Sequence, residues 1–211
     1  MTKFRIKISA ILLITVLLAA ITACGSVRPD TDELNFDALI LSSGTSLLMD
    51  AKGNEYLEQI DLISVWLPEG EEYPPVGSLV GYTIEGEIME SYPPQVWAVS
   101  LEIIEEESEP TIISLDLAEK IKEHQPQDTV LLDVRTSEEF TDGHVAGAVS
   151  LPLAELEANI PAYYDINATL IVYCRGTCSS AHAAKVLNEA GFKLVFDAGG
   201  IESYSGEIVT D

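Results

Sequence analysis

The sequence predicts an α/β domain, with a parallel sheet covered by helices on both faces, that follows a small all-β domain. From about residue 112 onward, short uninterrupted apolar runs alternate with helical patterns, which is typical of buried parallel strands joined by helices. Upstream of this region, short runs rich in β-branched residues are separated by proline and glycine, which is typical of a small β domain. The two patterns predict domains at residues 35–104 and 112–211.

The first 23 residues predict an export signal. Lys3, Arg5 and Lys7 precede an almost wholly apolar run, residues 8–21, which is too short for a comfortable membrane span. It ends in small residues before Cys24, and this pattern resembles the lipobox of bacterial lipoproteins. The resemblance implies a lipid on Cys24, so we expect an extracytoplasmic protein anchored to the outer face of the bacterial cell membrane. Two alternatives stay open: an ordinary signal peptide with a chance cysteine, and an uncleaved signal anchor.

Acidic residues dominate the chain, with 35 Asp and Glu against 11 Lys and Arg. Loss of the three basic residues of the signal would take the formal net charge from −24 to −27. Such a surface repels phosphate backbones, so nucleic acid is not an expected partner. Residues 24–34 are polar and predict a tether. Residues 105–111 form an acidic run that includes Pro110 and predict a linker.

The predicted β domain contains about five or six short strands over about 70 residues, which suggests a small barrel of OB-like type. The stretch from Val80 to Gln95 also resembles a small β domain found in lipoproteins of Gram-positive bacteria. Tyr82, Tyr92 and Trp97 offer a stacking platform for a sugar or peptide, although aromatic residues in small barrels more often pack in the core or at the rim. The sequence names no ligand or protein partner for this domain.

Strands and helices alternate through the second domain. Ser114 can cap its first helix, and Thr136 with Glu139 forms a capping box that opens a short second one. Gly191 is placed to end a later helix. The predicted helices are 115–124, a short one after Thr136, 153–160 and 180–190, and the predicted strands are 130–134, 148–151, 170–173 and 194–196.

Cys174 follows the buried strand 170–173 and precedes a glycine-containing loop and a helix. In open α/β sheets, ligands bind beyond the C-terminal ends of the strands. A helix N-terminus and the adjacent Arg175 favour a thiolate, and Gly176 allows the backbone to curl so that its N–H groups face an anion. The pattern indicates a nucleophilic cysteine. The alternative is a small apolar residue that ends a buried strand.

Three ordered motifs resemble the rhodanese domain. Residues 132–140 with 143–148 are similar to that family's opening signature, residues 172–180 to its active-site loop, and residues 198–201 to its last turn. The resemblance spans about residues 112–211. It implies a sulfurtransferase whose cysteine takes up sulfane sulfur as a persulfide and passes it to cyanide or a thiol, without a cofactor.

The resemblance also implies roles for individual residues. Cys174 would accept the sulfur, and Asp133 with Arg135 would support the neighbouring strand end as a scaffold ion pair. The backbone amides of the loop would hold the persulfide, and this loop comprises Arg175, Gly176, Thr177, Cys178 and Ser179. We interpret Thr136 and Glu139 as helix-capping residues, and His144 as a hydrogen-bonded turn residue rather than an acid or base.

The loop departs from the family pattern at two positions. Family members active on thiosulfate often carry a second basic residue where this chain has Ser179, which puts efficient use of thiosulfate in doubt. Cys178 adds a second thiol, which could resolve a persulfide, form a disulfide with Cys174 or only fill the loop. Two thiols without a third and fourth ligand do not predict a metal site.

The sequence therefore predicts a membrane-anchored sulfurtransferase that uses Cys174, with a small sulfur compound or thiol as its partner. Two alternatives stay open. One is a thiol–disulfide or sulfur-sensing module that uses Cys174 and Cys178, and the other is a catalytically inactive rhodanese-like binding module.

Overall fold

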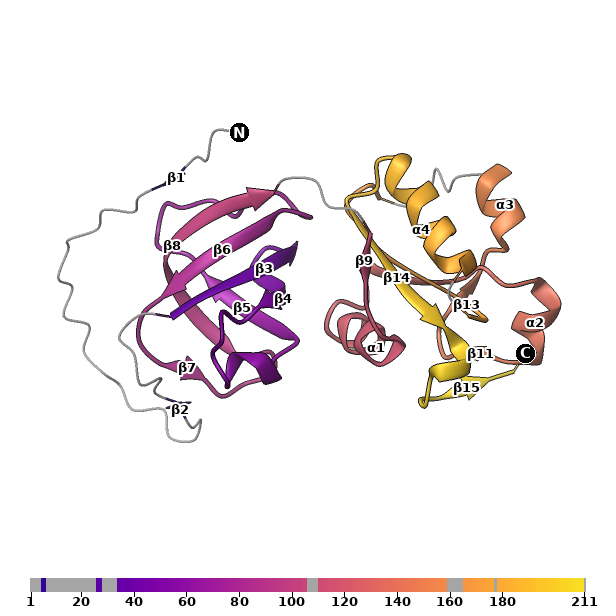
Figure 1. Ribbon diagram of the computed structural model, residues 1–211, viewed down its shortest axis with the longest axis horizontal. Helices are drawn as coiled ribbons and strands as arrows, with labels where there is room; N and C mark the ends of the chain where they lie inside the picture. The colour runs from indigo at the N-terminus through magenta and orange to yellow at the C-terminus, as the bar shows by residue number, and fades with distance from the viewer. Residues whose placement is uncertain are drawn as a thin grey trace. The chain divides into compact units, whose positions relative to one another are not determined.

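The computed structural model describes residues 5–6, 26–27, 34–105, 110–158, 165–176 and 178–210. The chain divides into two compact units, Met1–Glu107 and Ser108–Asp211, and each is described by itself (Figure 1). Most of the predicted signal, tether and linker falls outside the described residues, so these three remain predictions. Within the described part, no helix has both the length and the apolar character needed to cross a lipid bilayer.

The first unit is built from β-strands, with one short 3-10 helix at Leu57–Gln59. Strands β3, β4, β5, β8 and β6 pair in that order, and β6 pairs back to β3, so the pairings form a closed cycle. The β5–β8 pair is parallel and the other four are antiparallel. Two-residue strands β1 and β2 pair with β8 and β7. The strands are β1 Arg5–Ile6, β2 Ser26–Val27, β3 Leu34–Ser42, β4 Thr45–Asp50, β5 Leu62–Trp66, β6 Leu79–Ile84, β7 Ile88–Met89 and β8 Gln95–Glu105.

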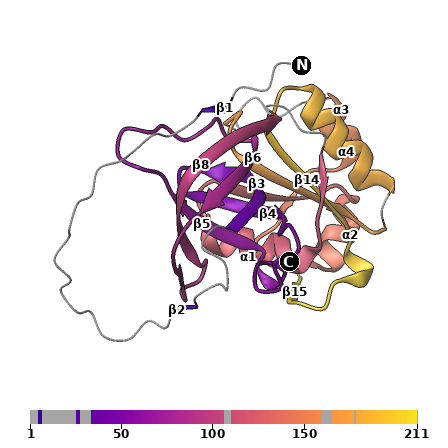
Figure 2. The same cartoon turned by 60° about the vertical axis from the view of Figure 1, so that its left-hand side comes forward.

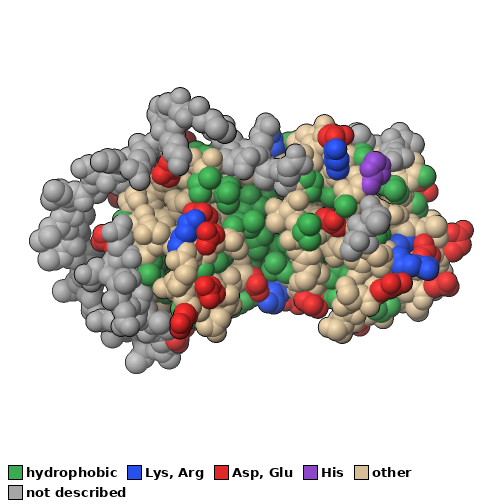
Figure 3. Space-filling model, in the orientation of Figure 1, with side chains coloured by type: hydrophobic (Ala, Val, Ile, Leu, Met, Phe, Trp, Pro, Cys, Tyr) green, Lys and Arg blue, Asp and Glu red, His purple; other side chains and the backbone are tan. Residues whose placement is uncertain are grey.

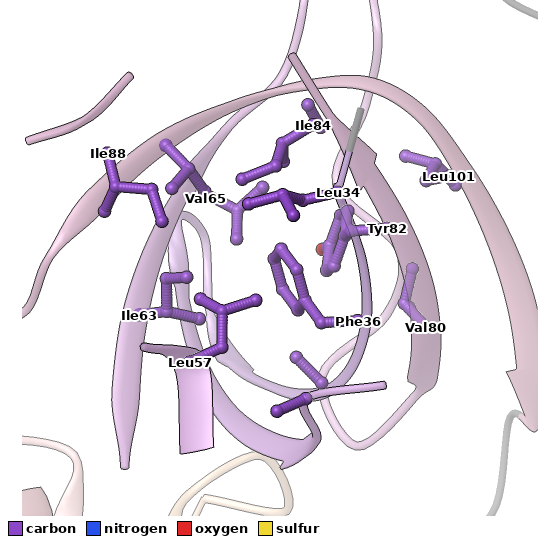
Figure 4. Packing of buried hydrophobic residues seen from close by; sticks show 14 of the residues in the cluster. Leu34, Phe36, Leu57, Ile63, Val65, Val80, Tyr82, Ile84, Ile88 and Leu101 are labelled. Carbon is purple, nitrogen blue, oxygen red and sulfur yellow. The ribbon is translucent and has the colours of Figure 1, made fainter. Parts of the chain in front are cut away.

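Alternation of side chains along the strands creates the core of this unit. In β6, the buried residues Val80, Tyr82 and Ile84 alternate with partly exposed ones, as expected when only one face of a strand is covered. Figure 4 shows these side chains converging with Phe36 and Ile63 from other strands. Tyr82 therefore packs in the core, as the sequence favoured for aromatic residues of a small barrel, and it cannot belong to a stacking platform because its side chain is only 1% exposed.

Other aromatic side chains of the first unit lie on its surface. Trp97 is exposed, as is Tyr92. Trp66 is also exposed and is the register partner of Trp97 on the neighbouring parallel strand. The place of Trp66 beside Trp97 was not predictable from the sequence, because the register between two strands about 30 residues apart has no local signal.

The second unit contains a five-stranded parallel sheet in the order β12-β10-β13-β14-β9. A separate antiparallel pair joins β11 to β15. The strands are β9 Thr111–Ile112, β10 Thr129–Asp133, β11 His144–Val145, β12 Val149–Ser150, β13 Thr169–Cys174, β14 Leu194–Gly200 and β15 Ile208–Val209. The helices are α1 Leu115–His124, α2 Ser137–Asp142, α3 Leu153–Ala158 and α4 Cys178–Glu189, with a 3-10 turn at Ile201–Ser203.

Helices cover both faces of this sheet, as Figures 1 and 2 show, with α3 and α4 on one face and α1 on the other. The side chains of β13 alternate between the faces, so Leu170, Val172 and Cys174 belong to one apolar cluster. The same cluster contains Ala183 and Leu187 of α4. The prediction of an α/β domain with a parallel sheet is confirmed.

The predicted capping residues begin two of the helices. The Ser114 hydroxyl accepts a hydrogen bond from the amide of Leu117 at the start of α1. Thr136 and Glu139 form the predicted capping box of α2. Helix α4, however, begins at Cys178 and not at Ser180, which is fully buried inside the helix.

Candidate active site

Cys174 is the last residue of β13, at the edge of the sheet where parallel strands end. Its side chain is buried, and it contributes to a pocket of about 430 Å³. The pocket combines the end of β10, the start of α2, the loop after β13 and the first turn of α4. Its lining residues are Val134, Arg135, Thr136, Glu139, Cys174, Arg175, Gly176 and Ser179.

The structure brings most of the predicted site residues to this pocket. Arg135, Cys174, Arg175, Gly176 and Ser179 all line it. Thr177 and the side chain of Cys178 lie outside the described residues, so the predicted roles of Cys178 remain untested. Asp133 does not line the pocket but lies behind it, against Arg135.

The thiol of Cys174 donates a hydrogen bond to the carbonyl oxygen of Gly176, with Sγ and oxygen 2.9 Å apart. A carbonyl oxygen accepts hydrogen bonds and cannot donate them, so this contact is not one of the N–H groups expected to hold an anion. Where Gly176 approaches the sulfur, it presents its carbonyl oxygen and not the N–H group that we expected. Thr177, the next residue of the loop, lies outside the described residues. Ser179, in the first turn of the 12-residue helix α4, borders the same pocket, so the positive end of a helix dipole lies there.

Of the two glycines near Cys174, Gly200 is the one that no larger residue could replace without a clash, whereas Gly176 has room for a side chain. Gly176 does not have a positive φ, and a β-carbon built on it would meet nothing within 4 Å. A β-carbon on Gly200 would lie 2.7 Å from both Cα and the carbonyl oxygen of Gly176. The end of β14 therefore packs directly on the backbone of the cysteine loop.

Arg175 and Glu139 form an ion pair at the mouth of the pocket. Arg175 Nε lies 2.9 Å from Glu139 Oε1, and Arg175 Nη2 contacts the same oxygen. The other carboxylate oxygen of Glu139 accepts a hydrogen bond from the amide of Thr136 at 3.2 Å. This backbone hydrogen bond, followed by the side-chain bond with Arg175, lowers the pKa of Glu139. Glu139 is therefore a charged pocket residue as well as a helix cap.

Asp133 and Arg135 form the scaffold ion pair that we predicted. Arg135 donates from Nε to Asp133 Oδ1 at 3.0 Å and from Nη2 to Oδ2 at 2.6 Å, and its backbone amide also bonds Oδ1 at 2.9 Å. The Asp133 carboxylate is fully buried, and its hydrogen bond to Arg135 raises the pKa of that guanidinium. Arg135 also donates to the carbonyl of Gly143 at 2.7 Å. The pair holds the end of β10 beside the pocket.

His144 is buried next to α2 and does not line the pocket. Its Nδ1 lies 2.9 Å from the carbonyl oxygen of Phe140, and its ring stacks on the Phe140 ring with centroids 3.7 Å apart. This is the hydrogen-bonded arrangement that we predicted. Among the residues that the structure describes, no three His, Cys, Asp or Glu side chains are grouped to hold a metal ion.

Two contributors to the site, Glu139 and Gly200, were not predicted from the sequence. The role of Glu139 at the pocket was hidden because the capping box already explained its residue type, and its partner Arg175 is 36 residues away. The sequence offered one general signal: in a chain this acidic, Arg175 was expected to have a carboxylate partner, although the sequence does not show which one. Gly200 lies in the predicted last turn, but no local pattern indicates which backbone it touches.

Residues 115–207 match the family model of the rhodanese-like domain. Thiosulfate sulfurtransferase PspE of Escherichia coli (strain K12) is 39% identical over 72 residues, which cover 34% of this chain and 69% of that protein. Thiosulfate sulfurtransferase GlpE of Coxiella burnetii (strain RSA 331 / Henzerling II) is 34% identical over 79 residues, or 37% and 73% of the two chains. The putative sulfurtransferase YtwF of Bacillus subtilis (strain 168) is 31% identical over 91 residues, or 43% and 85%.

A solved structure described as rhodanese with anions from E. coli aligns at 34% identity and a TM-score of 0.37, covering 39% of this chain and 99% of that one. The match of residues 115–207 to the family model, together with these relatives, defines the second unit as a rhodanese-like domain. The chain belongs to the rhodanese-like family, and its relatives include thiosulfate sulfurtransferases.

Proposed function

We propose that the chain is a sulfurtransferase that carries sulfane sulfur as a persulfide on Cys174 and passes it to a thiol or to cyanide. One observation carries the proposal: Cys174 ends β13 in a pocket of about 430 Å³ that the first turn of α4 also borders. A thiol at this edge of a parallel sheet is placed to meet a small ligand. The thiosulfate sulfurtransferases among its relatives support the same chemistry.

The transfer consists of two displacements at sulfur. After its proton leaves to solvent, the Cys174 thiolate attacks the outer sulfur of the donor. A sulfur–sulfur bond forms, the donor's own bond to that sulfur breaks, and the leaving group takes the electron pair, as sulfite does from thiosulfate. An acceptor nucleophile then attacks the terminal sulfur of the persulfide, and the Cys174 thiolate is restored. No external oxidant or reductant is needed.

The proposal includes an extracytoplasmic location, with the membrane as a partner through a lipid on Cys24. The basic start, short apolar run and small residues before Cys24 support it. Radiolabelled palmitate fed to expressing cells should label the wild-type chain and not Cys24→Ser, and only the wild type should sediment with membranes. A wild-type chain that sediments with membranes but takes up no label would instead indicate an uncleaved anchor.

We also propose that the first unit is an OB-like barrel. Its closed cycle of strand pairings, with the single parallel pair β5–β8 in that cycle, supports this assignment.

The test of sulfur transfer uses the full chain, reduced and purified in a non-ionic detergent. Thiosulfate and an organic persulfide are offered separately, and mass spectrometry of peptides detects the addition of one sulfur atom at Cys174. We expect loading by at least one donor and turnover with cyanide, both abolished in Cys174→Ser and retained in Cys178→Ser. If no donor loads Cys174, the proposal fails. A disulfide that needs both Cys174 and Cys178, without loading, would favour a redox module instead.

A further inference from the structure

Both cations of the pocket are paired with carboxylates. Arg135 is held by the buried Asp133, and Arg175 by Glu139. Among the described lining residues, the charged ones are Arg135, Arg175 and Glu139. With Asp133 included, the four formal charges around Cys174 sum to zero. The charged side chains around the pocket therefore offer an incoming anion no net positive charge, and the positive end of α4 is left as the attractive feature.

The surroundings of the pocket add to this effect. Residues 108–211 contain six Lys and Arg against 17 Asp and Glu, a formal net charge of −11. Figure 3 shows basic groups beside acidic ones on the visible face rather than gathered in a basic patch. A field of this sign opposes the approach of anions, and the opposition grows with the charge of the anion.

The Arg175–Glu139 pair is much more exposed to solvent than the Asp133–Arg135 pair. The Arg175 side chain is 66% exposed and that of Glu139 is 26% exposed, whereas the Arg135 and Asp133 side chains are 9% and 0% exposed. Glu139 is also held in place by the amide of Thr136, so its carboxylate stays at the mouth of the pocket. The carboxylate of Glu139 thus neutralises the positive charge of Arg175, the cationic residue of the cysteine loop.

Building on the proposed function, we infer that Glu139 is a specificity-determining residue, which makes the pocket favour sulfane-sulfur donors that carry at most one negative charge over donors that carry two. A donor of this class is an organic thiosulfonate of the form R–SO₂–S⁻. The Cys174 thiolate attacks its terminal sulfur, and the sulfinate R–SO₂⁻ leaves with the electron pair of the broken bond. The dianion thiosulfate reacts by the same displacement but meets one more unit of repulsion.

The test compares donors of similar size and different charge on the full chain in detergent. Methanethiosulfonate is a monoanion and thiosulfate a dianion, and each rate constant for loading Cys174 is divided by the rate constant for the same donor with a small free thiol. We expect wild type to favour methanethiosulfonate after this normalisation. Glu139→Gln should raise the rate constant for thiosulfate at least about fivefold more than that for methanethiosulfonate.

The substitution is chosen to keep the fold. Glutamine also serves at the third position of a capping box, so Glu139→Gln keeps α2 capped while it removes the charge. Glu138→Gln is the matched control, because it removes the same charge from the same helical turn, where Glu138 is exposed and does not line the pocket. The ratio between the two donors should be unchanged in this control.

A second measurement does not depend on sulfur transfer. Iodoacetate and iodoacetamide are similar in size, and only the first is charged. We expect the ratio of their alkylation rates at Cys174, measured by peptide mass spectrometry, to rise several-fold in Glu139→Gln and to stay at the wild-type value in Glu138→Gln. Equal ratios in all three proteins would overturn the inference, even if both donors load Cys174. A raised alkylation ratio without loading by any donor would support the role of Glu139 at the pocket and overturn the sulfurtransferase proposal.

Discussion

Cys174 and Gly200 lie opposite each other on the neighbouring parallel strands β13 and β14. The hydrogen atom of Gly200 occupies the space where any other residue would place a β-carbon, and the backbone of Arg175 and Gly176 fills the rest. The carbonyl of Arg175 also accepts a long hydrogen bond of 3.5 Å from the amide of Glu202, just beyond Gly200. The position of the cysteine loop therefore depends on a residue about 25 positions away.

Gly200→Ala tests this dependence. The added methyl group has to displace the backbone of Gly176, so we expect the free energy of unfolding to fall by about 1–3 kcal/mol, a usual cost of overpacking. Loading of Cys174 should slow at the same time, because the loop moves. Urea denaturation followed by circular dichroism measures the first effect, and peptide mass spectrometry the second.

Gly176→Ala is the matched control for stability. Its β-carbon has open space and its φ is not in the left-handed region, so the free energy of unfolding should stay the same or rise by up to about 1 kcal/mol. Equal losses of stability in the two variants would contradict the crowding that we describe at Gly200.

The buried ion pair behind the pocket gives a second prediction. Asp133→Asn leaves the guanidinium of Arg135 without its carboxylate in a site where the side chains are 9% and 0% exposed. Removal of one partner of a buried pair costs about 3–5 kcal/mol, because the remaining charge stays buried. Urea denaturation followed by circular dichroism measures this loss in the second unit.

An exposed pair in the same unit provides the comparison. Lys185 and Glu189 lie 3.7 Å apart on α4, and both side chains are largely exposed. Glu189→Gln should change the free energy of unfolding by no more than about 0.5 kcal/mol. A small and similar change in Asp133→Asn would show that the buried pair contributes little to folding.

Local signals explain why much of this site was predictable from the sequence. The apolar run before Cys174 predicted a buried strand, and the capping box was recognised because Thr136 and Glu139 are three residues apart. Both features act within one strand or one helical turn. The position of Cys174 at a strand end could therefore be predicted without knowledge of the tertiary structure.

Features that depend on contacts between distant segments were not predictable. The last long strand was expected to end at Phe196, because Asp197 and the following glycines are poor strand formers, but its pairing with β13 extends it to Gly200. The two-residue strands β9, β11 and β15 are too short to show a period. Helix α4 starts at Cys178, two residues before its expected start. Ser180 is buried by contacts with other segments, and the local sequence does not show this burial.

The capping box of α2 gives a third prediction, which separates stability from donor preference. Thr136→Ala removes the hydroxyl that accepts a hydrogen bond from the amide of Glu139, and we expect a loss of about 1 kcal/mol in the free energy of unfolding. The amide of residue 136 still donates to the Glu139 carboxylate, so the ratio of iodoacetate to iodoacetamide alkylation at Cys174 should not change. Thr141→Ala is the control, because its exposed hydroxyl only bonds the carbonyl of Ser137 within the helix. Unchanged stability in Thr136→Ala would show that the cap contributes nothing.

The buried Tyr82 predicts how the first unit responds to alkaline pH. Burial raises the pKa of Tyr82 above its usual value of 10.0. In the unfolded chain the phenol ionises at about pH 10, whereas in the folded chain it stays protonated, so the free energy of unfolding falls as the pH rises above about 10. Tyr82→Phe removes this loss. We therefore compare the free energies of unfolding of the variant and wild type at two pH values. Between neutral pH and about pH 11, the difference should shift by about 1 kcal/mol in favour of the variant.

Both tryptophans of the chain, Trp66 and Trp97, belong to the first unit, so their fluorescence during urea denaturation reports this unit alone. At neutral pH, the free energy of unfolding of Tyr82→Phe should differ from that of wild type by no more than about 1 kcal/mol, because the Ser46 side chain near the buried hydroxyl is not placed for a hydrogen bond of ordinary geometry. Tyr92→Phe changes an exposed tyrosine and should show the same difference from wild type at both pH values. If Tyr82→Phe shows no gain at alkaline pH, then Tyr82 ionises equally in both states, and its burial does not limit the alkaline stability of the first unit.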